Sequence, residues 1–400
     1  MLYIVVTTDK NGITDMIHSY PTLESIDQDV LGLIRDQRRM LKFQVGQNPL
    51  RWNGFLRKNT FARALQGSNS IEGIIANLDE AVAIIDDERP ETLEEETIRA
   101  LEGYRQAMTF IIRVHDDPHT KVDAQFIRSV HYMMMNYDMT KLPGQWRPGS
   151  VYVVHEATGD TVYEGPASEE VPALMDELVA QIHSANSVDS STVLGAMAHL
   201  NLAMIHPFKD GNGRMARALQ TLVISQNGVS SPTFCSIEEW LGRNTPAYYD
   251  ILKEIGQGSW HPRNSALPWV RFCLRAHYQQ ASTLMKRNEH IGRVWEEVSH
   301  IAKQHGLQER VEDPLLEAAF GYRIRNHRYR EENNISDVVA SRDLRRLCDL
   351  DLLEPIGEKR GRYYVASKTL LEIASRTRDN RRAGDPYEIV QKYQQLELGM

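Results

Sequence analysis

Apolar residues recur at intervals of three and four along most of this chain, and this spacing is the strongest constraint on its fold. The pattern is clear in Leu93 to Val114, Leu174 to Ile182 and Val193 to Ile205, and such spacing places a buried stripe on one face of a helix. One exception is Trp146 to Tyr163, where β-branched and aromatic residues flank a Gly159-Asp160 turn signal, as in a hairpin. We therefore expect a mainly α protein in which helices surround one β-ribbon.

Composition excludes several classes of protein. A chain of 400 residues with 42% hydrophobic and 25% charged residues is long enough for two or three globular units at about 150 residues each. The net charge of -8 argues against a protein that coats nucleic acid or anionic membrane as a whole, so any basic site must be local. The longest apolar stretch, Val193 to Ile205, carries His199 and Asn201 and is too short to span a membrane.

Cysteine usage and the first residues bear on the cellular compartment. Cys235, Cys273 and Cys348 are odd in number, far apart and without CxxC spacing, which favours neither a zinc ribbon nor a disulfide framework. The opening MLYIVVTTDKNG lacks the basic leader and apolar core of a signal peptide. We therefore expect a cytoplasmic protein.

The segment from His206 to Arg217, HPFKDGNGRMAR, lies between two apolar helical patterns and predicts a loop that runs into a helix. Gly211 and Gly213 allow positive φ and let backbone amides converge, while the following helix offers unpaired N–H groups and a positive dipole end. Arg214 and Arg217 are three residues apart, so both can bind one polyanion with forked donors. These features indicate a phosphate-binding nest.

An acid and a histidine add chemistry to this nest. Asp210 would be poorly placed beside phosphates unless a cation intervened, and a Mg²⁺ ion bridging carboxylate and phosphate oxygens resolves this. His206 can accept a hydroxyl proton near neutral pH. The residues alone favour a phosphoryl or nucleotidyl transferase with a histidine base. The alternative is a tight turn with surface arginines, which this density of functional residues disfavours.

This segment resembles the full signature HPFx(D/E)GNGRxxR of Fic-domain proteins, whose best-known members are AMPylases that move AMP from ATP to a protein hydroxyl; every specified position is present. The resemblance implies that His206 deprotonates a Ser, Thr or Tyr hydroxyl and that Asp210 holds Mg²⁺. Pyrophosphate would leave, with positioning and charge supplying the catalysis. It further implies that Gly211, Asn212 and Gly213 cradle the α and β phosphates, Arg214 stabilises the β–γ portion and Arg217 holds the γ-phosphate.

Upstream, SNSIEG at Ser68 to Gly73 resembles the inhibitory motif (S/T)xxxE(G/N) of the same family. The resemblance implies that Glu72 pairs with Arg217 and occupies the space of the γ-phosphate. The plain alternative is a helix end at which Glu72 is solvated and Gly73 is the C-terminal cap. The position of the motif ahead of a complete signature favours the inhibitory role of Ser68, Glu72 and Gly73.

Further segments are less specific. The hairpin resembles the flap with which family members align an extended target segment by strand addition; a purely structural ribbon is the alternative. Asn244, Tyr248 and Tyr249 resemble the adenine-side segment of the family, although paired tyrosines on a helix also serve as core packing. His183 and His199 lie on apolar helix faces, where we expect structural histidines.

The chain changes character after about Asn288. An apolar helix from Leu315, a helical pattern from Ile335 to Leu353 and the basic hairpin GEKRGRYYV predict a winged-helix-like module. Its basic residues could contact nucleic-acid phosphates, whereas a solvated face or a protein-docking surface is an equal alternative. The residues concerned are Arg342, Arg345 and Arg346 on the second helix and Lys359, Arg360 and Arg362 in the wing. An Arg-rich stretch with Arg323, Arg325, Arg328 and Arg330 lies between the two helices.

We expect three regions: an N-terminal helical region at 1–115 with the inhibitory motif at 68–73, a Fic catalytic core at 116–288, and a winged-helix-like domain at 289–400. The core would hold the flap at 146–163 and the signature loop at 206–217. The predicted function is a Mg²⁺- and ATP-dependent protein adenylyltransferase, autoinhibited by Glu72, that modifies a target protein and itself. A de-AMPylating hydrolase that uses Glu72, and a nucleotide-sensing DNA-binding regulator, are the alternatives. Related proteins can dimerise, but no residue locates a dimer interface.

Overall fold

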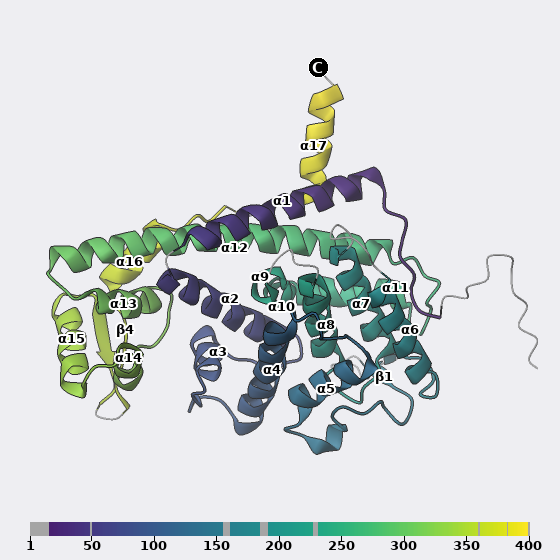
Figure 1. Ribbon diagram of the computed structural model, residues 1–400, viewed down its shortest axis with the longest axis horizontal. Coiled ribbons are helices and arrows are strands. Elements are labelled where there is room, and N and C mark those ends of the chain that lie inside the picture. Colours follow the sequence, from purple (N-terminus) through teal and green to yellow (C-terminus); the bar gives the residue numbers. More distant parts are fainter. Residues whose placement is uncertain are drawn as a thin grey trace, which may run out of the picture.

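The computed structural model describes residues 16–48, 50–154, 161–184, 191–226, 231–358, 361–381 and 383–398. Within them, helices dominate, and the strands form two separate two-stranded antiparallel sheets (Figure 1). The predicted mainly α fold is confirmed. The three periodic segments are helices α4 (Glu95–Val114), α6 (Val171–His183) and α7 (Ser191–Ile205).

Helix α7 forms the centre of the larger part of the molecule. Every residue of α7 except Ala203 is buried, as expected for a helix that is apolar on all sides. It packs against α8 (Asn212–Gln226). The signature loop predicted at 206–217 is shorter, at 206–211, because residues 212–217 already form the first turns of α8. The other helices of this part are α2 (Leu50–Ser70), α3 (Leu78–Ile85), α5 (Ala124–Met135), η1 (Met139–Lys141), α9 (Pro232–Cys235), α10 (Glu238–Arg243) and α11 (Thr245–Gly256).

Two long helices, α1 (Ser25–Gln47) and α12 (Leu267–Gln304), pack side by side along the molecule, and α12 leads from the helical core to the C-terminal elements. Helix α12 runs nearly the whole length of the molecule, with α1 packed along it and α17 (Pro386–Leu398) against α1 (Figure 1). Helix α12 is unbroken across residues 288–289, where the sequence predicts a domain boundary. The C-terminal module therefore follows a rigid helix rather than a flexible linker.

The C-terminal module, defined here as residues 309–376, lies at one end of α12 (Figure 1). The helical pattern predicted up to Leu353 ends earlier, at Asp349, because Asp351 takes a positive φ of 54° and Leu353 begins a strand. Lys359 and Arg360 lie outside the described residues, and the winged-helix assignment stays a prediction. Its elements are η3 (Glu309–Val311), α13 (Glu312–Ala319), α14 (Asn326–Asn333), α15 (Asp337–Asp349), β3 (Leu353–Ile356), β4 (Tyr363–Ala366) and α16 (Lys368–Arg376).

Arginines between α13 and α15 bind this chain's own carboxylates. The nitrogen–oxygen distances between the side chains are 3.2 Å from Arg323 to Asp79, 3.1 Å from Arg325 to Glu88, and 2.7 Å from Arg328 to Asp86. All three carboxylates belong to α3 or the turn after it. The Arg-rich stretch thus joins the C-terminal module to the helical core.

None of the helices among the described residues combines the length and the apolar character needed to cross a membrane.

Candidate functional site

The signature loop connects α7 to α8 in six residues, and its own side chains hold it in shape. His206 and Gly211 take positive φ values of 52° and 76°. The Asn212 amide spans the loop: Phe208 N donates to its Oδ1 and its Nδ2 donates to Phe208 O, each over 2.9 Å. The Asn212 side chain is therefore occupied, and this position can offer an anion its backbone N–H at the start of α8.

Arg214 is a buried cation with unused donors. Its Nη2 donates to Met135 Sδ at 3.1 Å, and within the described residues Nε and Nη1 have no partner. A buried guanidinium without an acceptor is costly. Its position at the first turn of a helix suits an anionic ligand, because the helix dipole adds to its charge.

Arg217, one turn further along α8, is fully partnered on one edge by the predicted inhibitory segment. Its Nη2 donates to Glu72 Oε1 at 2.6 Å and to Ser68 O at 2.9 Å, while Nε donates to Ser68 Oγ at 2.8 Å. Burial by itself would lower the pKa of Arg217, but the carboxylate of Glu72, together with Tyr248 and Tyr104, outweighs it and raises that pKa. The structure thus brings Ser68, Glu72 and Arg217 together as predicted.

Glu72 lies in a turn directly after α2. Gly73, with φ of 76°, and Ile74 donate their N–H groups to Ser70 O and Asn69 O, which closes the helix as a C-terminal glycine cap does. The capping role of Gly73 and the ion pair of Glu72 therefore occur together. A Cβ on Gly213 would lie 2.5 Å from Glu72 Oε1, so the carboxylate sits directly over the nest.

His206 is the first residue of the loop, and one of its ring nitrogens is available to accept a proton. Its Nδ1 lies 3.2 Å from Ala203 O; since a carbonyl only accepts, Nδ1 carries the proton of the neutral ring and Nε2 keeps its lone pair. Burial, more than the nearby Arg147, lowers the pKa of His206 from its usual value. The imidazole is therefore neutral and basic at Nε2 at physiological pH.

Asp210 is the only carboxylate within the loop. Its Oδ1 accepts from Gly211 N at 2.6 Å and its Oδ2 pairs with Lys141 Nζ at 3.1 Å. No cluster of three or more His, Cys, Asp and Glu side chains able to hold a metal occurs in the described part of the chain. One half-exposed carboxylate suits Mg²⁺ only when phosphate oxygens and water complete the ligand set, and Asp210 fits that case.

Two residues that the sequence analysis did not assign hold the loop from outside. His131 Nδ1 accepts from Gly144 N at 2.9 Å, so its Nε2 donates to Asp210 O at 2.8 Å, and burial lowers the pKa of His131 to about 4. Arg147 donates to the carbonyls of His206 at 2.9 Å and Gly149 at 2.6 Å. No short-range pattern marks either residue, since both act on a loop at least 59 positions away.

The base of the predicted hairpin is present, and its role as a flap stays a prediction. Strands β1 (Tyr152–Val154) and β2 (Thr161–Glu164) pair antiparallel, and the predicted turn at Gly159-Asp160 lies outside the described residues. Tyr163 donates to Met204 O at 2.8 Å, which ties the ribbon to the end of α7. The hairpin therefore starts beside the signature loop.

Of the predicted adenine-side residues, the two tyrosines lie together, with ring centroids 5.5 Å apart, and Asn244 lies elsewhere. Tyr248 is buried, and its hydroxyl bonds His199 Nε2 at 2.9 Å. Tyr249 is half exposed and donates to Ile71 O at 3.0 Å, in the turn that carries Glu72. Asn244 donates to Trp240 O at 2.7 Å and lines a different, basic cavity. His183, like His199, is hydrogen-bonded, in its case to Val122 O.

Known proteins resemble the part of the chain that carries this site. Residues 121–224 match the family model described as "Fic/DOC family". The chain is 22% identical over 280 residues to a protein adenylyltransferase Fic of Nematostella vectensis, which covers 67% of this chain and 58% of that protein. It is 27% identical to the Aedes aegypti protein of the same name over 42% of this chain and 30% of that one. The chain thus spans less than two thirds of these relatives.

Solved structures share the fold. A Fic family protein from Desulfovibrio desulfuricans superposes with a TM-score of 0.56 at 19% identity, over 88% of this chain and 99% of that one. Fic-1 of C. elegans gives a TM-score of 0.53 at 20% identity, over 65% of this chain and 72% of the other. At these identities the likeness establishes the fold alone.

Proposed function

Because this chain belongs to the Fic/DOC family, we propose that it is a protein adenylyltransferase that moves AMP from ATP to a Ser, Thr or Tyr hydroxyl of a target protein and of itself. The main support is Arg214, whose buried Nε and Nη1 have no partner among the described residues. These donors lie at the N-terminal turn of α8, where backbone N–H groups can also bind an anion. A triphosphate would satisfy both.

The remaining residues of the loop take roles that suit this transfer. The hydroxyl oxygen of the target bonds to the α-phosphorus while the bond from that phosphorus to the α–β bridging oxygen breaks, and pyrophosphate leaves. His206 Nε2 takes the hydroxyl proton, because Nδ1 is bonded to Ala203 O. The backbone at Gly211 to Gly213 holds the phosphates. Mg²⁺, held by Asp210, would supply neutralisation of the phosphate charge.

Glu72 restrains this reaction in the proposal. Its Oε1 lies 2.6 Å from Arg217 Nη2 and directly over Gly213, where the γ-phosphate would otherwise bind. A hundredfold restraint requires a bias of only about 2.7 kcal/mol toward the occupied state. One carboxylate–guanidinium pair with a fully buried arginine is enough for that.

The test is incorporation of α-labelled ATP into protein with Mg²⁺ and a cell extract. We expect Glu72→Gly to incorporate AMP about a hundredfold faster than the wild type, and the added change His206→Ala to abolish the signal. Glu88→Gly is the matched control: Glu88 also forms an ion pair, 3.1 Å from Arg325, and is similarly exposed, at 22% against 27% for Glu72. It should leave incorporation at the wild-type level.

Other outcomes have clear meanings. Equal incorporation by wild type and Glu72→Gly would remove the restraint from the proposal. If the wild type instead releases AMP from a pre-modified protein and Glu72→Gly does not, the protein is a hydrolase that uses Glu72. Activity that persists without His206 would contradict the assigned base.

A further inference from the structure

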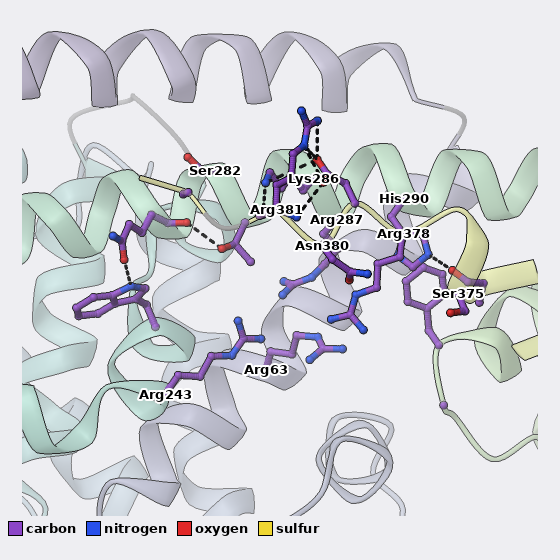
Figure 2. Close-up of a pocket in the computed structure, with 18 of the residues that line it drawn as sticks. Arg63, Arg243, Ser282, Lys286, Arg287, His290, Ser375, Arg378, Asn380 and Arg381 are labelled. Carbon is purple, nitrogen blue, oxygen red and sulfur yellow. Dashed lines mark hydrogen bonds and ion pairs between the residues drawn. The ribbon is translucent and has the colours of Figure 1, made fainter. Parts of the chain in front are cut away.

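A second site for an anion is a cavity of about 1050 Å³ between the helical core and the C-terminal module. Its walls come from α2, α10 and α12, from the turn after α13, and from α16 with the segment that follows it. None of its lining residues belongs to the signature loop. Figure 2 shows Arg63, Arg243, Arg287 and Arg378 reaching into one space from different elements.

The cavity carries a strong excess of positive charge. Six basic side chains line it against the single carboxylate of Asp379, with Glu239 directly behind the wall. Asp379 is already used: it binds Arg381 at 3.0 Å and lies 3.7 Å from Lys286 Nζ. The basic residues are Arg63, Arg243, Lys286, Arg287, Arg378 and Arg381.

Glu239 compensates only part of the remaining charge. Arg287 Nη2 donates to Glu239 Oε1 at 2.6 Å, and Arg243 binds the same oxygen. The Arg287 side chain is only 8% exposed, yet its Nη1 has no partner among the described residues. Arg287 lines the cavity, and a desolvated guanidinium donor without an acceptor is costly, so the charge of this side chain is only partly compensated.

Two further arginines form no ion pair among the described residues, and Glu239 acts on Arg63 only through its longer-range charge. Arg63 Nε donates to the neutral amide oxygen of Asn59 at 3.0 Å, and Arg378, which is exposed, has neither an ion pair nor a side-chain hydrogen bond there. Burial, and then repulsion from Arg287, lowers the pKa of Arg63 to about 10. The cluster is thus under electrostatic strain that a bound polyanion would relieve.

We propose that this cavity binds a small molecule with several phosphate groups, such as a free oligophosphate or a nucleoside polyphosphate. Forked guanidinium groups converge from several elements, which suits a compact polyanion with closely spaced phosphates. A nucleic-acid backbone would instead need basic groups spread along an open surface. The volume is that of a small-molecule site, and Trp240 and Phe320 in its wall offer apolar area beside the charges.

The test is calorimetric titration of the full chain with inorganic tripolyphosphate at physiological salt. Arg378→Glu is the main variant, since its exposed side chain supports nothing else in the described structure. We expect it to weaken binding at least about tenfold, because it replaces a forked donor with a repelling charge. Arg63→Gln, which keeps a polar side chain, should weaken binding in the same direction.

Two controls test whether the anion binds in this cavity. Arg345→Glu changes the net charge equally at an exposed position of α15 and should bind as the wild type does. Arg214→Gln removes a donor from the signature loop, and the cavity should still bind tripolyphosphate in that variant. Tighter binding of ATP than of tripolyphosphate by Arg214→Gln identifies a nucleotide, and the reverse a free oligophosphate; both support the site.

Three results would overturn the proposal. The first is wild-type chain that takes up no tripolyphosphate. The second is unchanged affinity in both Arg378→Glu and Arg63→Gln. The third is complete loss of binding in Arg214→Gln alone, which would place the anion in the signature loop. Because each readout is binding, the result does not depend on whether the protein transfers AMP.

Discussion

Arginines surround an anion position both at the signature loop and at the basic cavity. The two places differ in where the nearby carboxylate lies relative to those arginines. At the signature loop, Glu72 reaches across from the turn after α2 and pairs with Arg217, whose side chain is 1% exposed. At the cavity, Glu239 lies behind the wall, 5% exposed, and pairs with Arg287 and Arg243, whereas Arg63 and Arg378 form no ion pair among the described residues. Helix α2 takes part in both, through Ser68 at its end and Arg63 nearer its middle.

This difference separates a replaceable carboxylate from a structural one. Glu72 is 27% exposed, lies on a glycine-closed turn and holds Arg217 as its one ion-pair partner in the described structure. Glu239 accepts from Arg287, Arg243 and Gln280 Nε2. A phosphate can displace Glu72 by competing for the guanidinium of Arg217. Glu239, by contrast, is part of the framework that positions the arginines.

Removal of Glu239 should have the largest effect on stability. Glu239→Gln leaves Arg287 and Arg243 facing each other without a carboxylate, and loss of one partner of a buried pair costs about 3–5 kcal/mol. We expect that loss in the free energy of unfolding, measured with urea. Glu72→Gln, the matched change at the partly exposed pair, should cost clearly less.

The pH dependence offers an independent check of the same pair. Burial would raise the pKa of Glu239, but Arg287 and Arg243 outweigh it and hold that pKa at about 2, below the usual 4.5. A depressed carboxyl pKa stabilises the fold above pH 4.5, and that contribution disappears as the pH falls toward 2. Glu239→Gln should therefore lose less stability than the wild type between pH 4.5 and pH 2. If the free energy of unfolding of the two proteins falls in parallel over this range, the pairing of Glu239 with Arg287 and Arg243 is contradicted.

Gly213→Ala should show that Glu72 occupies the nest. The new Cβ would lie 2.5 Å from Glu72 Oε1 and 3.1 Å from Arg217 Nη1, so the carboxylate must move and weaken its ion pair. We expect a loss of about 1–2 kcal/mol in the free energy of unfolding, within the usual cost of overpacking.

The control for this change is the same substitution made in Glu72→Gly. There the clash with the carboxylate is gone, and alanine is the better helix former by about 0.5–1 kcal/mol. Gly213→Ala should then be neutral or slightly stabilising. Equal losses in the two backgrounds would show that Glu72 does not lie over Gly213.

Much of the helical core and the signature loop could be predicted because their determinants are local in sequence. Helix α7 is apolar throughout and the loop is a contiguous segment, so periodicity and motif spacing suffice. The resemblance to a family also predicted the pairing of Glu72 with Arg217, which are 145 residues apart. Composition and spacing alone would not have joined them.

The rest depends on contacts that only the packed helices create. Arg147 and His131 hold the loop through backbone carbonyls, which no side-chain pattern reveals. The basic cavity combines segments from α2 to the residues after α16, each with few arginines. Asn244 was predicted beside adenine from an amide near two tyrosines, yet its amide binds Trp240 O, because it ends α10 and faces the preceding turn.

Tyr249→Phe should have the smallest effect and distinguishes two roles for this residue. Tyr249 donates to Ile71 O at 3.0 Å, and loss of one such bond at a partly exposed site costs about 0.5–1 kcal/mol. If it steadies the turn of Glu72, AMP incorporation by the wild type should rise by at most about fivefold and that of Glu72→Gly should not change. A role in binding adenine would instead lower incorporation in both. The control is Tyr393→Phe, on α17 and 61% exposed, which should alter AMP incorporation in neither background. The direction of the change caused by Tyr249→Phe therefore shows whether Tyr249 belongs to the restraint or to the nucleotide site.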